Sequence, residues 1–504
     1  MPHSQTSFQK DGLAVFAAFI MLGAVYAALY LRLYPCVPWN CDDWTYLGLF
    51  HSILPSTARW NPARVFQEFF MPLAGYFAAY VVRPLCGLGY LEALTLTCSG
   101  LAATAWFSLS VLVYRFFLSV GQDRVPALCG LLLFTAGFFL ANALRLPLVI
   151  TDPIPNTLFT YDLPNILNAG LALALCRAIL NTGDTGKEDG RLFATPLSMA
   201  GARQHATALA CGLLIAYFTQ FSMTISSAIS AIPAGSLLLF RLIRHVRNAN
   251  NKAPGAVMRQ CAFLDLFCGV LVAFWFIAAC YDLHGGRFAS LSLSPQPFSA
   301  ILAMHYRALY TCIPPWLWLT LLLLIMVNAA ILAHDGKRGE NRPGNVALLT
   351  FLGVMGLSFV LLLTLNILIF YVTNIGLDNR FFFGWAFYFY ITLVVNALFL
   401  HKRFPPALVG LLPLPVLLLS NATLADPWMP RPMFYAEPRK AVVQAWLDDI
   451  VEADRAGEAE VVIRTPTEEW PHPKDYLGDR LARTLYHHGI TSRHMTIHQE
   501  APGR

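Results

Sequence analysis

The sequence carries little charge. Only 13% of its 504 residues are Asp, Glu, Lys or Arg, whereas 57% are hydrophobic and the mean hydropathy is +0.54. An ordinary soluble domain has about twice that share of charge, so this composition excludes one and predicts a polytopic membrane protein. The net charge of +6 is modest and lies in loops on one side, so no nucleic-acid partner is expected.

Several catalytic motifs are also absent. The sequence contains no Walker loop, HExxH, CxxC or GxSxG motif, and no GxGxxG motif between a predicted strand and a helix. These absences exclude the usual nucleotide, metalloprotease and serine-hydrolase sites, and they argue against an ATP-driven pump. The sequence also has no repeat of fixed period.

Apolar runs predict eleven membrane spans, each about as long as a bilayer requires. They lie near residues 12–32, 91–114, 125–144, 163–181, 204–221, 224–243, 261–281, 313–333, 347–371, 381–400 and 405–422. The first run lacks a small-residue cleavage site, so a retained helix is expected. The segment 241–259 has five basic residues and no acid, which predicts that it and the N-terminus are cytoplasmic and the C-terminus is outside.

The apolar segment from Phe69 to Leu88 is not counted among these spans, because a span there would invert every later loop. It contains Pro72, Arg83 and Pro84, and its cleanly apolar part of about ten residues is shorter than a span needs. It is therefore predicted to lie along the outer interface as an amphipathic helix. The first outer loop then runs from residue 33 to residue 90.

The residue pattern changes after residue 422. Two helical and two strand-like segments follow, at 441–456, 460–464, 476–488 and 492–498. The expected fold class is an all-α membrane protein: a helical bundle over residues 1–422, with a small α/β outer domain over residues 423–504.

Two pairs of cysteines lie in or beside predicted outer loops, Cys36 with Cys41 and Cys280 with Cys312. Disulfides persist on that side of a membrane, so each pair could be bridged. Four free thiols fit the sequence equally well.

Two adjacent carboxylates, Asp42 and Asp43, lie between aromatic residues shortly after the first predicted span. Such a pair can supply a general base, because burial and a neighbouring like charge raise the pKa of a carboxyl group. Asp43 directly before Trp44 is also good helix-capping chemistry, which spacing alone favours.

Arg64 and Glu68 are four residues apart on one predicted helical face. They could form a surface ion pair worth roughly a few tenths of a kcal/mol. Alternatively, the Arg64 guanidinium could bind a phosphate at the interface. The sequence leaves both interpretations open.

The remaining candidates are polar or aromatic residues of the outer segments, which suit the binding of sugar hydroxyls or of a lipid phosphate. They are Tyr46, Arg59, Asn61, Asp152, Tyr161, Asp162, Asp282, His284, Arg287, His305, Arg307, Asp378 and Arg380. The 152–162 loop equally suits an interhelical turn with Asp162 at a helix start. Arg380 is equally an interfacial anchor. No spacing of histidines compels a metal site.

The order of features in the first hundred residues resembles that of a known superfamily. A first span and an acidic outer loop are followed by Phe70-Met71-Pro72-Leu73 and by Gly87-Leu88-Gly89-Tyr90. This order is similar to the GT-C superfamily of polytopic glycosyltransferases, many of which have an aromatic-Arg-Pro-Leu opening, a Gly-Leu…Gly-Tyr-His turn and an early catalytic Asp. The chain departs from that pattern at Met71 and Leu91. Its Asp-Asp-aromatic loop resembles bacterial glucosyltransferases that modify O-antigen.

The resemblance implies an inverting glycosyltransferase of the bacterial inner membrane, with a periplasmic C-terminal domain. It would move a sugar from a polyprenyl-phosphate donor to a glycan, lipid or protein acceptor, with a divalent metal ion as a possible cofactor. Asp42 or Asp43 would be the base. The donor phosphate would be held by Arg64, Arg287, Arg307 and Arg380. The other residues of the site, Trp44 and Glu68 among them, would contact substrate.

Two other classes of function are compatible with the sequence. A transporter or flippase of lipid-linked saccharides would have ionisable residues within its spans. The charged residues in the predicted spans instead lie near span ends: Arg32, Glu92, Arg177, Arg241 and Asp265. A membrane assembly factor is the other class.

Overall fold

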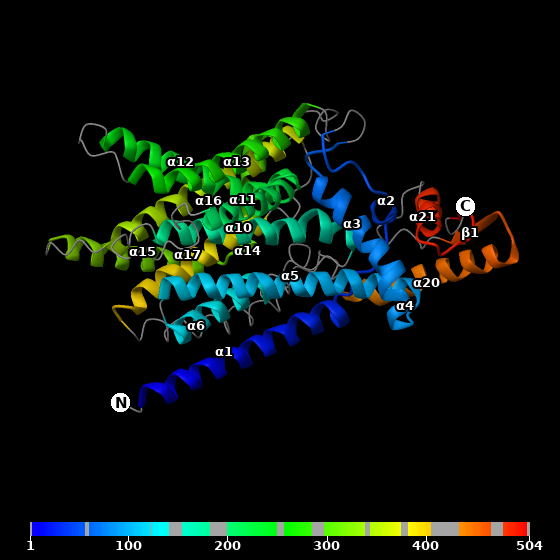
Figure 1. Cartoon of the computed structure of the whole chain (residues 1–504), viewed down its shortest axis with the longest axis horizontal. Helices are drawn as coiled ribbons and strands as arrows, with labels where there is room; N and C mark the ends of the chain where they lie inside the picture. Colours follow the sequence, from blue (N-terminus) through cyan, green and yellow to red (C-terminus); the bar gives the residue numbers. More distant parts are fainter. Residues whose placement is uncertain are drawn as a thin grey trace. The chain divides into compact units, whose positions relative to one another are not determined.

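The computed structural model describes residues 3–55, 60–121, 123–140, 154–181, 199–248, 257–284, 297–337, 343–373, 382–404, 433–464 and 477–500. In this part the chain is mostly helical, with one small parallel sheet (Figure 1). It forms two compact units. Unit 1 comprises Met1–Ala18, Ser108–Val149 and Asn165–Ala425, and unit 2 comprises Phe19–Phe107, Ile150–Pro164 and Asp426–Arg504.

Nine helical segments of the described residues are long and apolar enough to cross a membrane, which confirms an integral membrane protein. They are Asp11–Leu33, Val65–Cys86, Tyr90–Val120, Pro155–Leu180, Thr224–Ile243, Leu264–Leu283, Pro315–Asp335, Leu348–Tyr371 and Phe383–His401. All but Val65–Cys86 overlap a predicted span. The predicted spans 125–144 and 204–221 correspond to shorter apolar helices, Arg124–Leu140 and Ala210–Gln220. The predicted span 405–422 lies outside the described residues.

Unit 1 is a bundle built around one buried helix, α17 (Phe383–His401), which packs against α6 (Arg124–Phe134), α15 (Pro315–Lys337) and α16 (Pro343–Thr373). Its other helices are α11 (Met199–Gln220), α12 (Thr224–Asn248), α13 (Val257–His284) and α14 (Phe298–Cys312). Three long helices, α1 (His3–Ala28), α5 (Tyr90–Gly121) and α10 (Leu163–Asn181), belong partly to each unit. Small residues permit this packing: Gly137 lies directly against the ring of Tyr390.

Neutral polar side chains join three helices inside unit 1. Asn168 of α10 accepts hydrogen bonds from Gln220 of α11 at 3.1 Å and from Ser230 of α12 at 2.6 Å, and it donates to the carbonyl of Thr219 at 3.1 Å. Gln220 also donates to Ser230 at 2.6 Å. All four residues are buried. We call Asn168, Thr219, Gln220 and Ser230 the neutral polar cluster.

Unit 2 contains short helices and the C-terminal sheet. Besides the shared helices, its elements in chain order are η1 (Leu29–Leu33), α2 (Cys41–Gly48), α3 (Val65–Phe77), η2 (Ala78–Val82), α4 (Arg83–Cys86), α9 (Pro155–Thr157), η4 (Leu158–Asp162), α20 (Met433–Ala456), β1 (Glu460–Arg464), α21 (Leu477–His487) and β2 (Thr496–Glu500). The strands β1 and β2 are parallel, with Val462 opposite His498. Parallel strands need a crossover, and α21 supplies it. The predicted helices and strands of this C-terminal region are confirmed.

The segment around Pro72 differs from its prediction. Residues Val65–Cys86 form one helical run of 22 residues, so the argument that this segment is too short to span a membrane is wrong. Pro72 has no N–H to offer the carbonyl of Glu68 four residues earlier. That carbonyl instead accepts the backbone N–H of His51 at 3.5 Å, which lets the helix continue through the proline.

Two further expectations are settled in unit 2. The helix containing Asp162 begins at Pro155, with proline at its first position, so Asp162 lies inside a helical turn and not at a helix start. No disulfide joins Cys36 and Cys41, and Cys280 of unit 1 is likewise in its thiol form. The side chain of Cys312 lies outside the described part of the chain.

Candidate functional site

Asp43 anchors the N-terminus of α2. Asn40 and Asp43 form a capping box, in which the Asn40 side chain accepts the backbone N–H of Asp43 at 2.9 Å. The Asp43 carboxylate accepts the N–H groups of Trp39 at 2.8 Å and Asn40 at 3.0 Å through Oδ2, and that of Asn156 at 2.7 Å through Oδ1. Asp43 is 0% exposed. Asp43 therefore takes part in helix capping, as the sequence suggests, but the N-cap residue is Asn40 and Asp43 is the third residue of the helix.

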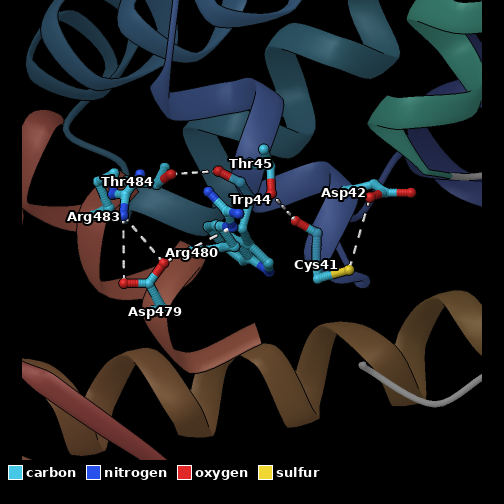
Figure 2. Close-up of polar contacts among 8 residues, drawn as sticks. All are labelled: Cys41, Asp42, Trp44, Thr45, Asp479, Arg480, Arg483 and Thr484. Carbon is cyan, nitrogen blue, oxygen red and sulfur yellow. Dashed lines mark hydrogen bonds and ion pairs between the residues drawn. The ribbon is translucent and has the colours of Figure 1, made fainter. Parts of the chain in front are cut away.

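Asp42 lies in a different environment from its neighbour. It is half-buried, and within the described residues its carboxylate accepts one hydrogen bond, from the Cys41 thiol, whose sulfur is 3.8 Å from Oδ1. Figure 2 shows its side chain pointing away from α21. Asp42, Thr45 and Tyr46 share the half-buried stripe of α2, since residues three and four apart lie on one helical face. Asp42 is thus the carboxylate of the pair that can meet a substrate.

A guanidinium is bound by Tyr46, which lies one helical turn after Asp42 on α2. Arg64 donates from Nη1 to the hydroxyl of Tyr46, and its Cζ lies 5.9 Å from the centre of the Tyr46 ring. Asn61 shapes the approach to Arg64, because its side chain accepts the N–H of Ala63 at 3.1 Å and its carbonyl accepts the N–H of Arg64 at 3.0 Å. Asn61 therefore stabilises the turn that places Arg64.

Glu68 pairs with a residue that sequence reasoning missed. Its buried carboxylate lies 3.1 Å from Nδ1 of His51, so the surface ion pair between Arg64 and Glu68 is wrong as an interpretation. The His51 ring also lies edge-on to Tyr46, with 6.3 Å between ring centres. The sequence gives only an indirect signal for His51. Because Pro72 has no N–H, the carbonyl of Glu68 needs a donor from elsewhere, and the backbone N–H of His51 is that donor.

The segment that begins at residue 154 joins α2 and α3 to this site. Asn156 donates its N–H to Asp43 and accepts a hydrogen bond from Gln67 of α3 on its side-chain oxygen. Tyr161 and Asp162 are buried in η4, a few residues further on. We call Asp42, Tyr46, His51, Arg64 and Glu68 the α2 face. It brings two carboxylates, one phenol, one imidazole and one guanidinium to the same side of a short helix.

Other predicted site residues lie elsewhere. Trp44 is fully buried, so its ring is part of the packing of unit 2. In unit 1, Asp282 accepts a hydrogen bond from the Thr224 hydroxyl, and Arg307 is exposed on α14. His305 is buried between the rings of Phe370 and Trp385, and this burial lowers its pKa.

Several predicted residues cannot be placed in the site. Arg59, Asp152, Arg287, Asp378 and Arg380 lie outside the described residues, as does the side chain of His284. In the described ranges, no group of three or more His, Cys, Asp or Glu side chains could hold a metal ion. Of the predicted site residues, the α2 face contains Asp42, Tyr46, Arg64 and Glu68.

Comparison with known proteins adds no family to this description. No protein-family model, no curated protein and no solved structure matches the chain.

Proposed function

We propose that this protein is a GT-C-type membrane glycosyltransferase that takes a sugar from a polyprenyl-phosphate donor and passes it to an acceptor at the outer face. The observation that supports this most directly is the α2 face. A half-buried carboxylate, Asp42, stands one helical turn from a tyrosine that holds an arginine. A glycosyl transfer with a phosphate leaving group needs those two chemical functions, a base and a cation.

The proposed reaction is a single displacement with inversion. Asp42 takes the proton of the acceptor hydroxyl, and the acceptor oxygen forms a bond to the anomeric carbon of the sugar. The bond from that carbon to the phosphate oxygen breaks, and the electron pair leaves with the lipid phosphate. Arg64 stabilises the charge that develops there, as a guanidinium does for phosphate oxygens. Phosphate needs no general acid, so one carboxylate suffices.

Asp43 supports this mechanism without taking part in proton transfer. Both of its oxygens accept backbone N–H groups, so its carboxylate fixes the loop and the first turn of α2. A base attached to a rigid helix needs less reorganisation to reach the acceptor. The two adjacent carboxylates thus have different proposed tasks, one chemical and one structural.

A transporter of lipid-linked saccharides is the second candidate, and the neutral polar cluster is the observation that favours it. Polar side chains inside membrane bundles can line a substrate path. In the described residues of that cluster, however, the polar groups bond to one another and carry no ionisable side chain. Helix association explains such bonds without a substrate.

The decisive experiment measures transfer from a panel of radiolabelled polyprenyl-phosphate sugars to membrane extract. Asp42→Asn should fold and lose transfer by roughly 10²- to 10⁴-fold, the usual contribution of a general base. Arg64→Ala should weaken transfer as well. Asp479→Asn is the matched control, because Asp479 is an exposed carboxylate of α21 that pairs with Arg483. If the wild type consumes no donor, or if Asp42→Asn behaves as the control does, the glycosyltransferase is rejected and the transporter becomes the better hypothesis.

A further inference from the structure

The carbonyl end of α2 is held by side chains from distant parts of unit 2. The last four carbonyls of a helix have no partner within it, and in α2 these include the carbonyls of Leu47 and Gly48. Here the Trp44 carbonyl accepts the Thr484 hydroxyl of α21 (Figure 2), and the Leu47 carbonyl lies 3.1 Å from Nε2 of His488, next to α21. The Gly48 carbonyl accepts the Tyr76 hydroxyl at 3.4 Å. We call Thr484 and His488 the α21 clamp.

The chemistry of His488 fixes its protonation. A carbonyl oxygen only accepts, so Nε2 of His488 must carry the proton that it donates to Leu47. Its Nδ1 then accepts the Tyr90 hydroxyl, 2.6 Å away. Burial lowers the pKa of His488 to about 4, so the ring is neutral near pH 7. One nitrogen of this imidazole therefore holds α2, and the other binds Tyr90 at the start of α5.

Two glycines allow this close approach. A Cβ added at Gly48 would lie 2.9 Å from the Cα of Thr484, and one added at Gly75 would lie 2.8 Å from Cε1 of His488. Backbone atoms and a buried ring cannot give way easily. The fit between α2, α3 and α21 thus depends on the absence of side chains at these two positions.

The C-terminal segment also holds the other end of α2. Trp39, whose N–H binds Asp43, stacks on Trp446 of α20 with 5.5 Å between ring centres and 22° between planes. The guanidinium carbon of Arg439 lies 5.9 Å from the centre of the Trp39 ring, a cation–π distance. Trp446 is fixed in turn, since its Nε1 donates to the Arg464 carbonyl of β1 at 2.7 Å.

We infer that the described parts of the C-terminal segment, residues 433–464 and 477–500, are a positioning element of the site. The helix α20 holds the residues before the N-terminus of α2 and the α21 clamp holds its C-terminal end, so that together they orient Asp42. Thr484 and His488 are positioning residues, since they touch the backbone of α2 and no reacting atom. This inference deepens the proposed function and rests on it. It assigns the small α/β region to catalysis, although that region is more than 380 positions from α2 along the chain.

The test uses paired variants of the full-length protein. Thr484→Val removes the hydroxyl at nearly constant volume, and Thr484→Ser restores it. His488→Leu removes the Nε2 donor, and His488→Gln supplies an amide N–H in a similar place. We expect Thr484→Val and His488→Leu to lower kcat by roughly 10- to 100-fold, as small misplacements of catalytic groups do, with the donor KM within about twofold of wild type. The Ser and Gln variants should recover most of kcat.

Hydrogen exchange of the α2 amides gives a readout that is independent of transfer. Exchange in residues 42–48 should become at least about tenfold faster in Thr484→Val and His488→Leu, because the clamp no longer holds the helix. Unchanged exchange and unchanged kcat in variants with wild-type thermal stability would overturn the inference. If the wild type transfers no sugar but exchange is still faster in the variants, the proposed function is rejected, whereas the stabilisation of α2 by Thr484 and His488 is supported.

Discussion

The two units differ in the buried polar groups that hold their segments together. The neutral polar cluster of unit 1 consists of amides and hydroxyls that bond to one another across helices. Among the described residues, unit 1 also buries His305 and Asp335, and unit 2 buries Asp43, Glu68, Asp162, Arg439 and His488. Two of these, Asp43 and His488, bind backbone groups of the loop and helix around residues 39–48. The neutral groups join helices to each other, whereas Asp43 and His488 fix the shape of one short segment.

The energetic consequences of these two arrangements differ. A cross-helix hydrogen bond in a membrane protein is worth about 0.6 kcal/mol on average, and seldom more than about 1.7. A buried carboxylate that loses its partners, or leaves donors unpaired, costs several times more. The ion pairs of unit 1 are less deeply placed: Arg241 pairs with Asp265, and Arg403 with Asp335, and each pair has a partly exposed side chain. Substitutions at the buried ionisable groups of unit 2 should therefore lower the free energy of unfolding more than substitutions in the neutral polar cluster of unit 1.

The largest expected effect is on Asp43. In Asp43→Asn, an amide NH₂ must face at least one of the backbone N–H groups that the carboxylate now accepts, and the remaining bonds lose their charge. We expect a loss of about 3 kcal/mol in the free energy of unfolding, since a hydrogen bond to a charged group contributes roughly 1.5–3 kcal/mol. Thermal melting of the purified protein in detergent measures it.

Asp42→Asn is the matched control for that variant, with the same chemical change one residue away. The Asp42 carboxylate accepts one hydrogen bond in the described chain, from a thiol at 3.8 Å, so the loss should stay below about 0.5 kcal/mol. Equal destabilisation by the two variants would contradict the assignment of a structural role to Asp43 and a chemical role to Asp42.

The next effect concerns pH and His488. Its folded pKa of about 4 lies below the value of about 6.5 expected in the unfolded chain, so the neutral ring stabilises the fold. This contribution is complete above pH 6.5 and is lost as the pH falls toward 4. It amounts to on the order of 3 kcal/mol, from about 1.4 kcal/mol per pKa unit. Wild type should therefore lose stability over this range more steeply than His488→Gln.

The control for this pH effect is the neighbouring histidine. The titratable groups that face His488 are His487, Tyr76 and Tyr90. The side chain of His487 is exposed, so His487→Gln should keep the steep acid dependence of wild type. If His487→Gln flattens the pH dependence and His488→Gln does not, the clamp has been attributed to the wrong imidazole.

The sequence predicts the local parts of unit 2 better than its assembly. Capping chemistry at Asp43 and the alternation of helix and strand after residue 440 depend on neighbours in the chain, and both are found. The contacts of Thr484 with Trp44 and of His488 with Leu47 join residues about 440 positions apart, for which one sequence carries no signal. The α21 clamp could not have been predicted from periodicity or spacing.

The missed pairing of His51 with Glu68 has a related cause. The i,i+4 spacing of Arg64 and Glu68 suggested a local ion pair, but each side chain finds a partner from another segment, Tyr46 and His51. In the sequence, Pro72 counts against a membrane span at residues 69–88, because a proline removes one helical hydrogen bond. Chain folding supplies the missing donor from His51. Predictions from neighbouring residues failed here because residues from other segments of the chain bind the same groups.

The smallest expected effect lies in unit 1, at Asn168. Asn168→Leu keeps the volume and removes three hydrogen bonds, but Gln220 and Ser230 can still bond to each other. We expect a loss of about 1 kcal/mol, the usual scale for such bonds between membrane helices. Since no partner in the cluster titrates, the melting temperature should fall by the same amount at pH 7 and pH 5, unlike the His488 variants. Sugar transfer should be unchanged. A variant that keeps its thermal stability but loses activity would show that the neutral polar cluster acts on substrate, which would break the distinction between the units and favour the transporter.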